Sequence, residues 1–160
     1  KLNKKRALAH AKKLSHPIFQ PYIVGQEISV DAWIDRSNLV KGLVLRKREF
    51  IVNGESKVTT TFRDQEFENQ FKIFLENFQF YGHVVLQAII NQQGEIHIIE
   101  CNARFGGAST ASITVGLDSL YWSILDSFNE DIKNYPFNRS DIEFTQVRVQ
   151  QDFNYPVTND

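Results

Sequence analysis

The sequence QGEIHIIECNARFGGAS, residues 93–109, alternates apolar with other side chains and then reaches a glycine pair. On an extended strand Glu100 and Asn102 point to the same face, because successive side chains point to opposite faces. Apolar residues occupy both faces before Glu100, which predicts a central strand that is covered on both sides. A carboxylate in that setting is costly unless a cation, a metal ion or hydrogen-bond donors compensate it.

A second apolar run, VVLQAII, comes just before this stretch, and residues 91–94 form the expected turn of a hairpin between the two. With Ile90 opposite Glu95, Gln87 would lie diagonal to Glu100 on the same face. A slip of one residue would turn Gln87 away, so the hairpin register decides whether it joins the site.

The polar groups of this hairpin allow two interpretations. Oxygen atoms from Gln87, Glu100 and Asn102, with no sulfur and no required imidazole, suit a hard ion such as Mg²⁺ better than zinc. The alternative is a buried ion pair between Glu100 and Arg104 that only fixes the end of the strand. Perturbed charges gather at functional sites but also in structural networks, so residue chemistry alone leaves both interpretations open.

Length and composition limit the class of protein. The chain has 160 residues, of which 42% are apolar and 13 are Phe, so it can bury the core of one globular domain. A formal net charge of −1 gives no overall basic field, so neither nucleic acid nor a membrane surface is an expected partner. Cys101 is the only cysteine, which excludes an intrachain disulfide, and we expect it to be a small buried filler.

Targeting signals and the ends of the chain add further expectations. No apolar run of roughly 18 residues and no signal-peptide pattern occurs, which indicates a soluble, cytoplasmic protein. The sequence has no methionine and begins at Lys1, so we expect it to be a processed or excised piece of a longer protein.

Hydrophobic periodicity along the chain predicts an α+β fold, a mainly antiparallel sheet flanked by helices. Asp64 is the expected N-cap of a helix whose Phe side chains recur at helical spacing and pack into the core. Besides the strand that ends at Asn102, the expected strands cover residues 27–35, 39–45, 57–62, 84–90 and 144–150. The expected helices cover residues 1–15, 64–80, 120–128 and a stretch from about 111, and residues 152–160 are expected to form a polar tail.

Two other segments could contact an anion. Arg46, Lys47 and Arg48 form a cationic cluster at a strand end, and guanidinium groups bind phosphate and carboxylate in a bidentate manner. A solvated strand end explains the same cluster equally well. Gly106 and Gly107 precede a helix and could offer backbone N–H groups, although a glycine pair before a helix is common.

The segment IIECNARFGG resembles the E-x-N-x-R segment of the ATP-grasp superfamily and is most similar to carbamoyl phosphate synthase large chain-like proteins. The resemblance implies the C-terminal lobe of an ATP-grasp fold. It implies ATP as a ligand, with one or two Mg²⁺ ions, or Mn²⁺ in their place, on the ATP phosphates. The implied metal ligands are Gln87, Glu100 and Asn102; Arg104 is implied to meet the phosphate or acyl phosphate, and Arg46 and Arg48 to line the site.

The segment QPYIVGQE is similar to the ATP-grasp hinge. The resemblance places Gln20 at the acidic hinge position, Tyr22 at the backbone contact to adenine, and Glu27 at the ribose hydroxyls. Residues 1–25 would then be the end of the small lobe and the hinge. Residues 26–160 would be the C-terminal lobe that carries the metal and phosphate site.

The activity that the resemblance implies is an ATP-dependent ligase. A carboxylate or bicarbonate would be phosphorylated to an acyl phosphate, and an amine or ammonia would then displace phosphate. The missing N-terminal lobe of the same protein would supply further phosphate contacts, so we expect the 160-residue chain alone to be inactive, and a homodimer is a further expectation. The alternatives are a non-catalytic nucleotide-binding or regulatory module of the same fold, and a structural interaction domain.

Overall fold

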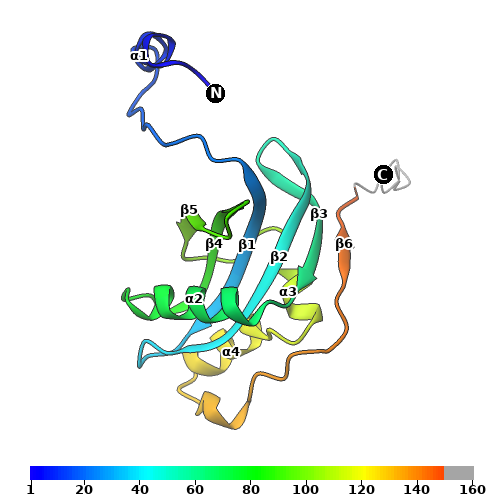
Figure 1. The fold of residues 1–160 in the computed structure, drawn as a ribbon. Helices are drawn as coiled ribbons and strands as arrows, with labels where there is room; N and C mark the ends of the chain where they lie inside the picture. The colour runs from blue at the N-terminus through cyan, green and yellow to red at the C-terminus, as the bar shows by residue number, and fades with distance from the viewer. Residues whose placement is uncertain (150–160) are drawn as a thin grey trace, which may run out of the picture.

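A computed structural model of the chain describes residues 1–149, so the expected tail at 152–160 and the expected strand end at Gln150 lie outside the described residues. Six antiparallel strands form one sheet in the order β5-β4-β1-β2-β3-β6 (Figure 1). The strands are β1 (Gly25–Ile34), β2 (Val40–Val52), β3 (Glu55–Phe62), β4 (Gly82–Asn91), β5 (Ile96–Asn102) and β6 (Thr145–Val147). The helices are α1 (Lys4–Ala11), α2 (Gln65–Glu76), α3 (Thr110–Thr114) and α4 (Ser119–Ser127), with a short 3-10 helix, η1 (Ile132–Asn134). The predicted fold class, an antiparallel sheet flanked by helices, is confirmed.

Helix α2 covers one face of the sheet. Its N-cap is Asp64, as predicted, whose side chain accepts hydrogen bonds from the backbone N–H groups of Glu66 and Phe67. Phe71 and Leu75 of α2 are fully buried against alternate side chains of the strands. The sheet residues of this core are Ile28, Val30, Ala32, Ile34, Leu43, Leu45, Val84, Leu86 and Ala88.

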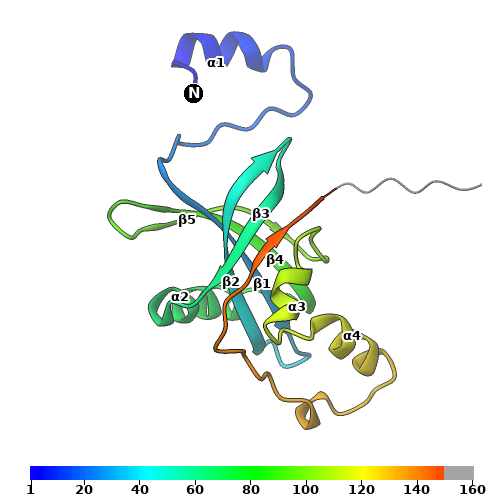
Figure 2. The same ribbon diagram turned by 90° about the vertical axis from the view of Figure 1, so that its right-hand side faces the viewer.

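Helices α3 and α4 cover part of the opposite face, so the sheet lies between α2 and these two helices (Figure 2). Trp33 and Val44 point to this side because they alternate with the residues under α2. Trp33 and Trp122 of α4 meet edge to face, with ring centroids 5.9 Å apart. This second core fills only one end of the face, and the other end of the same face carries polar side chains.

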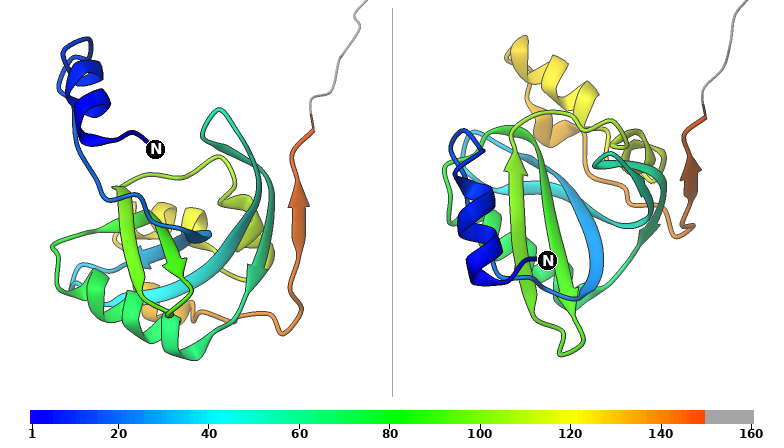
Figure 3. Two further views of the ribbon diagram at one scale, coloured as in Figure 1. Left: turned by 45° about the horizontal axis from the view of Figure 1, so that its top comes forward. Right: turned by 90° about the horizontal axis from the view of Figure 1, so that it is seen from above.

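Three features of the β4–β5 region differ from the sequence prediction. Strand β5 is an edge strand, not a central one, and β5 and β6 lie at opposite edges of the sheet (Figure 3). Its apolar residues pack on one side only, and Cys101 is exposed instead of buried, so it is not a core filler. The register also differs, because Ile90 pairs with Ile96 and a bulge at Ile99 follows.

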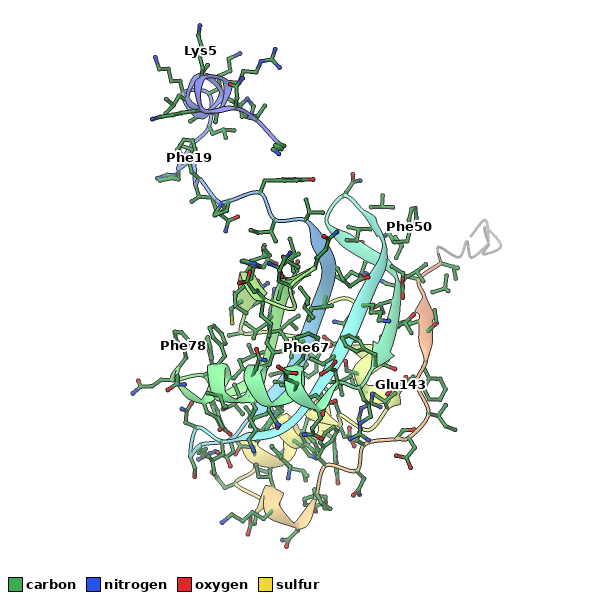
Figure 4. All side chains as sticks on the ribbon, in the orientation of Figure 1. Lys5, Phe19, Phe50, Phe67, Phe78 and Glu143 are labelled. Carbon is green, nitrogen blue, oxygen red and sulfur yellow. The ribbon has the colours of Figure 1, made fainter. Side chains whose placement is uncertain are left out.

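The N-terminal segment stands apart from the sheet. No residue of α1 is buried, and the helix covers only part of the predicted range 1–15. Residues 12–24 form a linker, which turns at residues 12–16 and then has no regular secondary structure, and on it Phe19 lies far from the body of the fold (Figure 4). The linker joins the sheet at the end of β1 that contains Glu27, next to the polar end of the sheet face (Figure 1).

Helix α2 ends at Glu76, four residues before the predicted end at Phe80. The last aromatic residue of the predicted stripe, Phe78, is therefore 47% exposed instead of being part of the core. Among residues 1–149, no helix has both the length and the apolar character that crossing a membrane requires.

Candidate functional site

A polar pocket of about 230 Å³ lies at the end of the sheet face that α3 and α4 leave uncovered. Strands β1, β2 and β4 form its floor, and the turns after β2 and after β5 form its walls. Four arginines from three parts of the chain line it, namely Arg46, Arg48, Arg104 and Arg148. Such a concentration of guanidinium groups indicates a site for an anion.

Arg48 is held by several polar groups of the pocket. Its side chain is 4% exposed and forms an ion pair with Glu27 on the adjacent strand. It also donates hydrogen bonds to Gln87 Oε1 and, at 2.6 Å, to the carbonyl oxygen of Gly54. Its Nε is buried and has no hydrogen-bond partner among the described residues. The alternative interpretation, that this arginine belongs to a solvated strand end, is therefore wrong.

The hairpin register brings the three predicted metal ligands together. Gln87 lies directly opposite Glu100, because the bulge at Ile99 shifts the pairing by one residue. The diagonal placement expected from an Ile90–Glu95 pairing is therefore wrong, but the bulge turns Glu100 to the face of Gln87. The Nε2 of Gln87 and the Nδ2 of Asn102 donate to the same oxygen, Glu100 Oε1, at 2.7 and 2.9 Å.

Arg104 lies at the mouth of the pocket and is exposed. Its Nη1 donates to the neighbouring carbonyl oxygen of Phe105 at 3.0 Å. Among the residues described, no carboxylate lies within ion-pair distance of Arg104, and Glu100 is exposed. The alternative of a buried pair between Glu100 and Arg104 is therefore wrong, and this guanidinium is available to a ligand.

The remaining predicted site residues separate into two groups. Glu27 reaches the edge of the pocket through its ion pair with Arg48, and its side chain is 38% exposed. Gln20 and Tyr22 lie on the linker at residues 12–24 and are exposed. Neither contributes to the pocket lining formed by the described residues, and the ring of Tyr22 lies beside the Lys1 amine instead.

Sequence analysis missed Arg148, which follows β6 and reaches the pocket from the far edge of the sheet. A Cβ atom added to Gly107 would lie 2.7 Å from Arg148 Nη1, so the guanidinium occupies the space that a side chain would fill. Arg148 also lies 3.7 Å from a carboxylate oxygen of Glu55. The alternation of residues 144–150 predicted the strand, but nothing in it distinguished this arginine from a solvated one.

Sequence analysis also missed Asp31, which lies beneath the pocket and is fully buried. Its carboxylate pairs with Arg46, whose Nε lies 2.5 Å from Oδ2, and accepts hydrogen bonds from the hydroxyls of Ser109 and Ser112. Burial alone would raise the pKa of Asp31, but the charge of Arg46, the imidazole of His83 nearby and a hydrogen bond from Arg46 hold it well below its usual value. The carboxylate is therefore ionised. Its position in the VDA sequence between two apolar residues was the available signal, since a buried charge needs partners.

A family model described as ATP-grasp in the biosynthetic pathway with Ter operon matches residues 13–150. The chain belongs to this ATP-grasp family. The match covers both the pocket and the linker that contains Gln20 and Tyr22. No curated protein matches the chain.

Solved structures with the same fold include carboxylases. The ATP-grasp chain superposes on the biotin carboxylase domain dimer of Hydrogenobacter thermophilus 2-oxoglutarate carboxylase, in complex with MgADP, ADP and bicarbonate. The TM-score is 0.68 at 16% identity, over 79% of this chain and 30% of that one. A complete multifunctional pyruvate carboxylase from Rhizobium etli gives a TM-score of 0.62 at 15% identity, over 77% of this chain and 14% of that one. The ATP-grasp chain thus spans less than a third of either protein, and the likeness shows the fold alone.

Proposed function

We propose that this chain carries the metal and phosphate site of an ATP- and Mg²⁺-dependent ligase, similar to the carbamoyl phosphate synthase large chain. The enzyme would join a carboxylate or bicarbonate to an amine or ammonia through an acyl phosphate. The observation that carries the proposal is the carboxylate of Glu100 beside a pocket that four arginines line. A metal-bound polyphosphate has the charge and the size to use both features.

The residues around Glu100 fit Mg²⁺. The second carboxylate oxygen, Oε2, accepts no hydrogen bond from the described residues, and neither does Oδ1 of Asn102. Mg²⁺ is commonly held by one or two carboxylates together with substrate phosphates, and amide oxygens suit it as well. Glu100 and Asn102 would hold the ion through these oxygens, and Gln87 through its Oε1, which also accepts a hydrogen bond from Arg48. Mn²⁺ could replace Mg²⁺. When bound, the metal would neutralise charge on the ATP phosphates.

The arginines provide the charge for phosphoryl transfer. A carboxylate oxygen of the acceptor would attack the γ-phosphorus, the bond to the β–γ bridging oxygen would break, and ADP would leave. Arg104, which has no carboxylate partner among residues 1–149, would stabilise the charge on the transferred phosphoryl group. The amine would then attack the acyl carbon, lose a proton and displace phosphate. Positioning and electrostatics can accomplish these steps without a side-chain nucleophile.

The nucleotide end of the proposed site is formed by Glu27 and the linker. Glu27 would accept hydrogen bonds from the ribose hydroxyls, and the backbone at Tyr22 would contact the adenine edge, with Gln20 at the hinge. The linker supports this arrangement because it leaves the sheet next to Glu27 (Figure 1). Further phosphate contacts would come from another lobe of the same protein, with residues 1–25 as the connection, or from a second copy in a homodimer.

The experiment that tests the proposal uses the full-length protein. Formation of ADP from ATP and Mg²⁺ is measured with bicarbonate and a panel of small carboxylates, each with ammonia or an amine. We expect ADP formation with one acceptor, and we expect Glu100→Gln to abolish it. Glu95→Gln is the matched control, because Glu95 lies in the turn of the same hairpin outside the pocket. Metal-dependent ATP binding without product from any acceptor would instead indicate the non-catalytic module.

A further inference from the structure

The buried carboxylate of Asp31 connects the floor of the pocket, through Arg46 on β2, to the wall formed by the turn after β5. Its Oδ1 accepts the hydroxyl of Ser109 at 2.5 Å. Its Oδ2 accepts the Nε of Arg46 at 2.5 Å and the hydroxyl of Ser112 at 2.6 Å. All four side chains are at most 2% exposed, so water does not compete for these hydrogen bonds.

Ser109 extends the connection to the glycine turn. The backbone N–H of Gly106 donates to the Ser109 hydroxyl at 3.0 Å, while that hydroxyl donates to Asp31. Gly106 and Gly107 both line the pocket. A single hydroxyl therefore joins the buried carboxylate to the backbone that faces the ligand.

Arg46 is oriented by the same carboxylate. Its Nε donates to Asp31, and its Nη1 donates to the hydroxyl of Thr59 at 3.2 Å. Two of its three guanidinium nitrogen atoms are therefore hydrogen-bonded on the buried side. No described residue accepts a hydrogen bond from its Nη2, and Arg46 lines the pocket. The guanidinium is thus fixed from the buried side and retains donors for an anion on the other.

His83 brings a third part of the wall into the network. Its Nε2 lies 3.4 Å from Asp31 Oδ1 and its Nδ1 lies 2.9 Å from the hydroxyl of Ser119. The ring of His83 stacks on Phe105, with centroids 4.1 Å apart. The carbonyl oxygen of Phe105 accepts a hydrogen bond from the Arg104 guanidinium, so the network extends to Arg104 through Phe105.

A buried ion pair of this kind is weak evidence for stability, since apolar residues of similar volume stabilise a core as well or better. We propose that Asp31 is a positioning residue that acts through Arg46 and through Ser109. It fixes the guanidinium of Arg46 and the turn at Gly106–Gly107 in the relative arrangement that binds the phosphate groups of the ligand. This inference rests on the proposed function for the identity of the anion.

Ser109 and Ser112 provide a matched pair of variants. Both hydroxyls are buried and both donate to the Asp31 carboxylate at nearly the same distance. Only the Ser109 hydroxyl also accepts a hydrogen bond from a residue that lines the pocket, the backbone N–H of Gly106. Ser112 lies within α3 and does not line the pocket. A role in stability alone predicts equal ligand binding by the two folded alanine variants, whatever their stabilities, whereas a positioning role predicts a difference in ligand binding.

The experiment measures the binding of pyrophosphate and of ATP with Mg²⁺ to the full-length protein by titration calorimetry, and kcat and KM if turnover occurs. We expect both Ser109→Ala and Ser112→Ala to lower the unfolding midpoint, Ser109→Ala by more, because its hydroxyl also accepts from Gly106 N–H and lies 3.3 Å from His83 Nε2. We expect Ser109→Ala to weaken pyrophosphate binding about tenfold, the effect of 1.4 kcal/mol, and Ser112→Ala to weaken it by less than about twofold. Ser109→Ala should also lower kcat/KM for ATP, and Ser112→Ala should not.

Each outcome decides between the proposals. Equal binding by the two variants would overturn the positioning role while leaving the ligase function intact. A difference between the variants in pyrophosphate binding, without any ATP-dependent product from wild type, would support the positioning role and overturn the ligase function. Failure of the wild type to bind either anion would overturn both.

Discussion

Arg46 donates from Nε to the Asp31 carboxylate at 2.5 Å, and this ion pair lies where the apolar core under α3 and α4 meets the polar pocket. Asp31 is on β1 and Arg46 on the adjacent β2, on the same face of the sheet. The two residues therefore contact both the apolar core and the polar pocket on that face. The carboxylate compensates an arginine that would otherwise be buried without a counter-ion, and the arginine faces the proposed ligand.

Replacing Asp31 should be costly for stability. Asp31→Asn keeps the shape but leaves the guanidinium of Arg46 buried without a countercharge, and we expect a loss of about 3–5 kcal/mol in the free energy of unfolding. Urea denaturation followed by circular dichroism measures it. Asp126→Asn is the control, because its partner Arg36 is largely exposed and stays solvated, so a much smaller loss is expected. Equal losses would show that the buried pair has no special role.

The depressed pKa of Asp31 makes stability sensitive to acid. Because its pKa is lower in the folded than in the unfolded protein, the ionised carboxylate stabilises the fold at pH values above its unfolded pKa, about 4. That contribution is lost as the pH falls from there toward the folded pKa. We expect the difference in unfolding free energy between wild type and Asp31→Asn to be constant above about pH 5 and to shrink below about pH 4. Urea denaturation at a series of pH values measures it, and a difference that stays constant down to pH 3 would contradict this.

Gly107→Ala should displace Arg148 without unfolding the protein. The added Cβ would lie 2.7 Å from Arg148 Nη1, the mobile end of a long side chain, so we expect stability to change by less than about 1 kcal/mol. We expect weaker pyrophosphate binding, to the same extent as in Arg148→Ala, and no further loss in the double variant.

The control for this substitution should show the reverse behaviour. Gly94 has a φ of +80° in the β4–β5 turn and no atoms near its missing Cβ. Gly94→Ala should therefore lower stability by about 1 kcal/mol and leave pyrophosphate binding unchanged. Additive losses in the double variant Gly107→Ala, Arg148→Ala would contradict the displacement.

Much of the fold followed from local sequence signals. Alternation, an apolar run and β-branched residues predicted strands at the positions of β1 to β5, although β2 continues to Val52 instead of ending at Leu45, and the N-cap at Asp64 marked the start of α2. The Asn53–Gly54 turn adopts the positive φ values, 52° and 81°, that this pair favours. These signals depend on backbone preferences within a few residues, so a single sequence contains them.

Features that depend on distant parts of the chain could not be predicted in this way. The sheet order that places β5 at an edge, and the bulge at Ile99, depend on which strands pair and where. Arg148, just after β6, reaches the pocket from a position 44 residues after Arg104, and no local signal connects the two. The partners of Asp31 likewise come from three separate segments, namely β2, β4 and the start of α3, which only the folded chain brings together.

The role of Glu27 separates two interpretations of the nucleotide end of the pocket. If Glu27 accepts hydrogen bonds from the ribose, as proposed, the full-length protein should bind ATP more tightly than 2′-deoxy-ATP, and Glu27→Gln should remove the preference. If its only role is the ion pair with Arg48, Glu27→Gln should weaken both nucleotides equally, because Arg48 loses its carboxylate partner. We expect the first outcome, with a loss of about 1–2 kcal/mol in ATP affinity, measured by titration calorimetry with Mg²⁺.

Glu49→Gln, at an exposed carboxylate on the same strand as Arg48, is the control and should leave both affinities unchanged. An equal loss for the two nucleotides would assign Glu27 to the support of Arg48 alone.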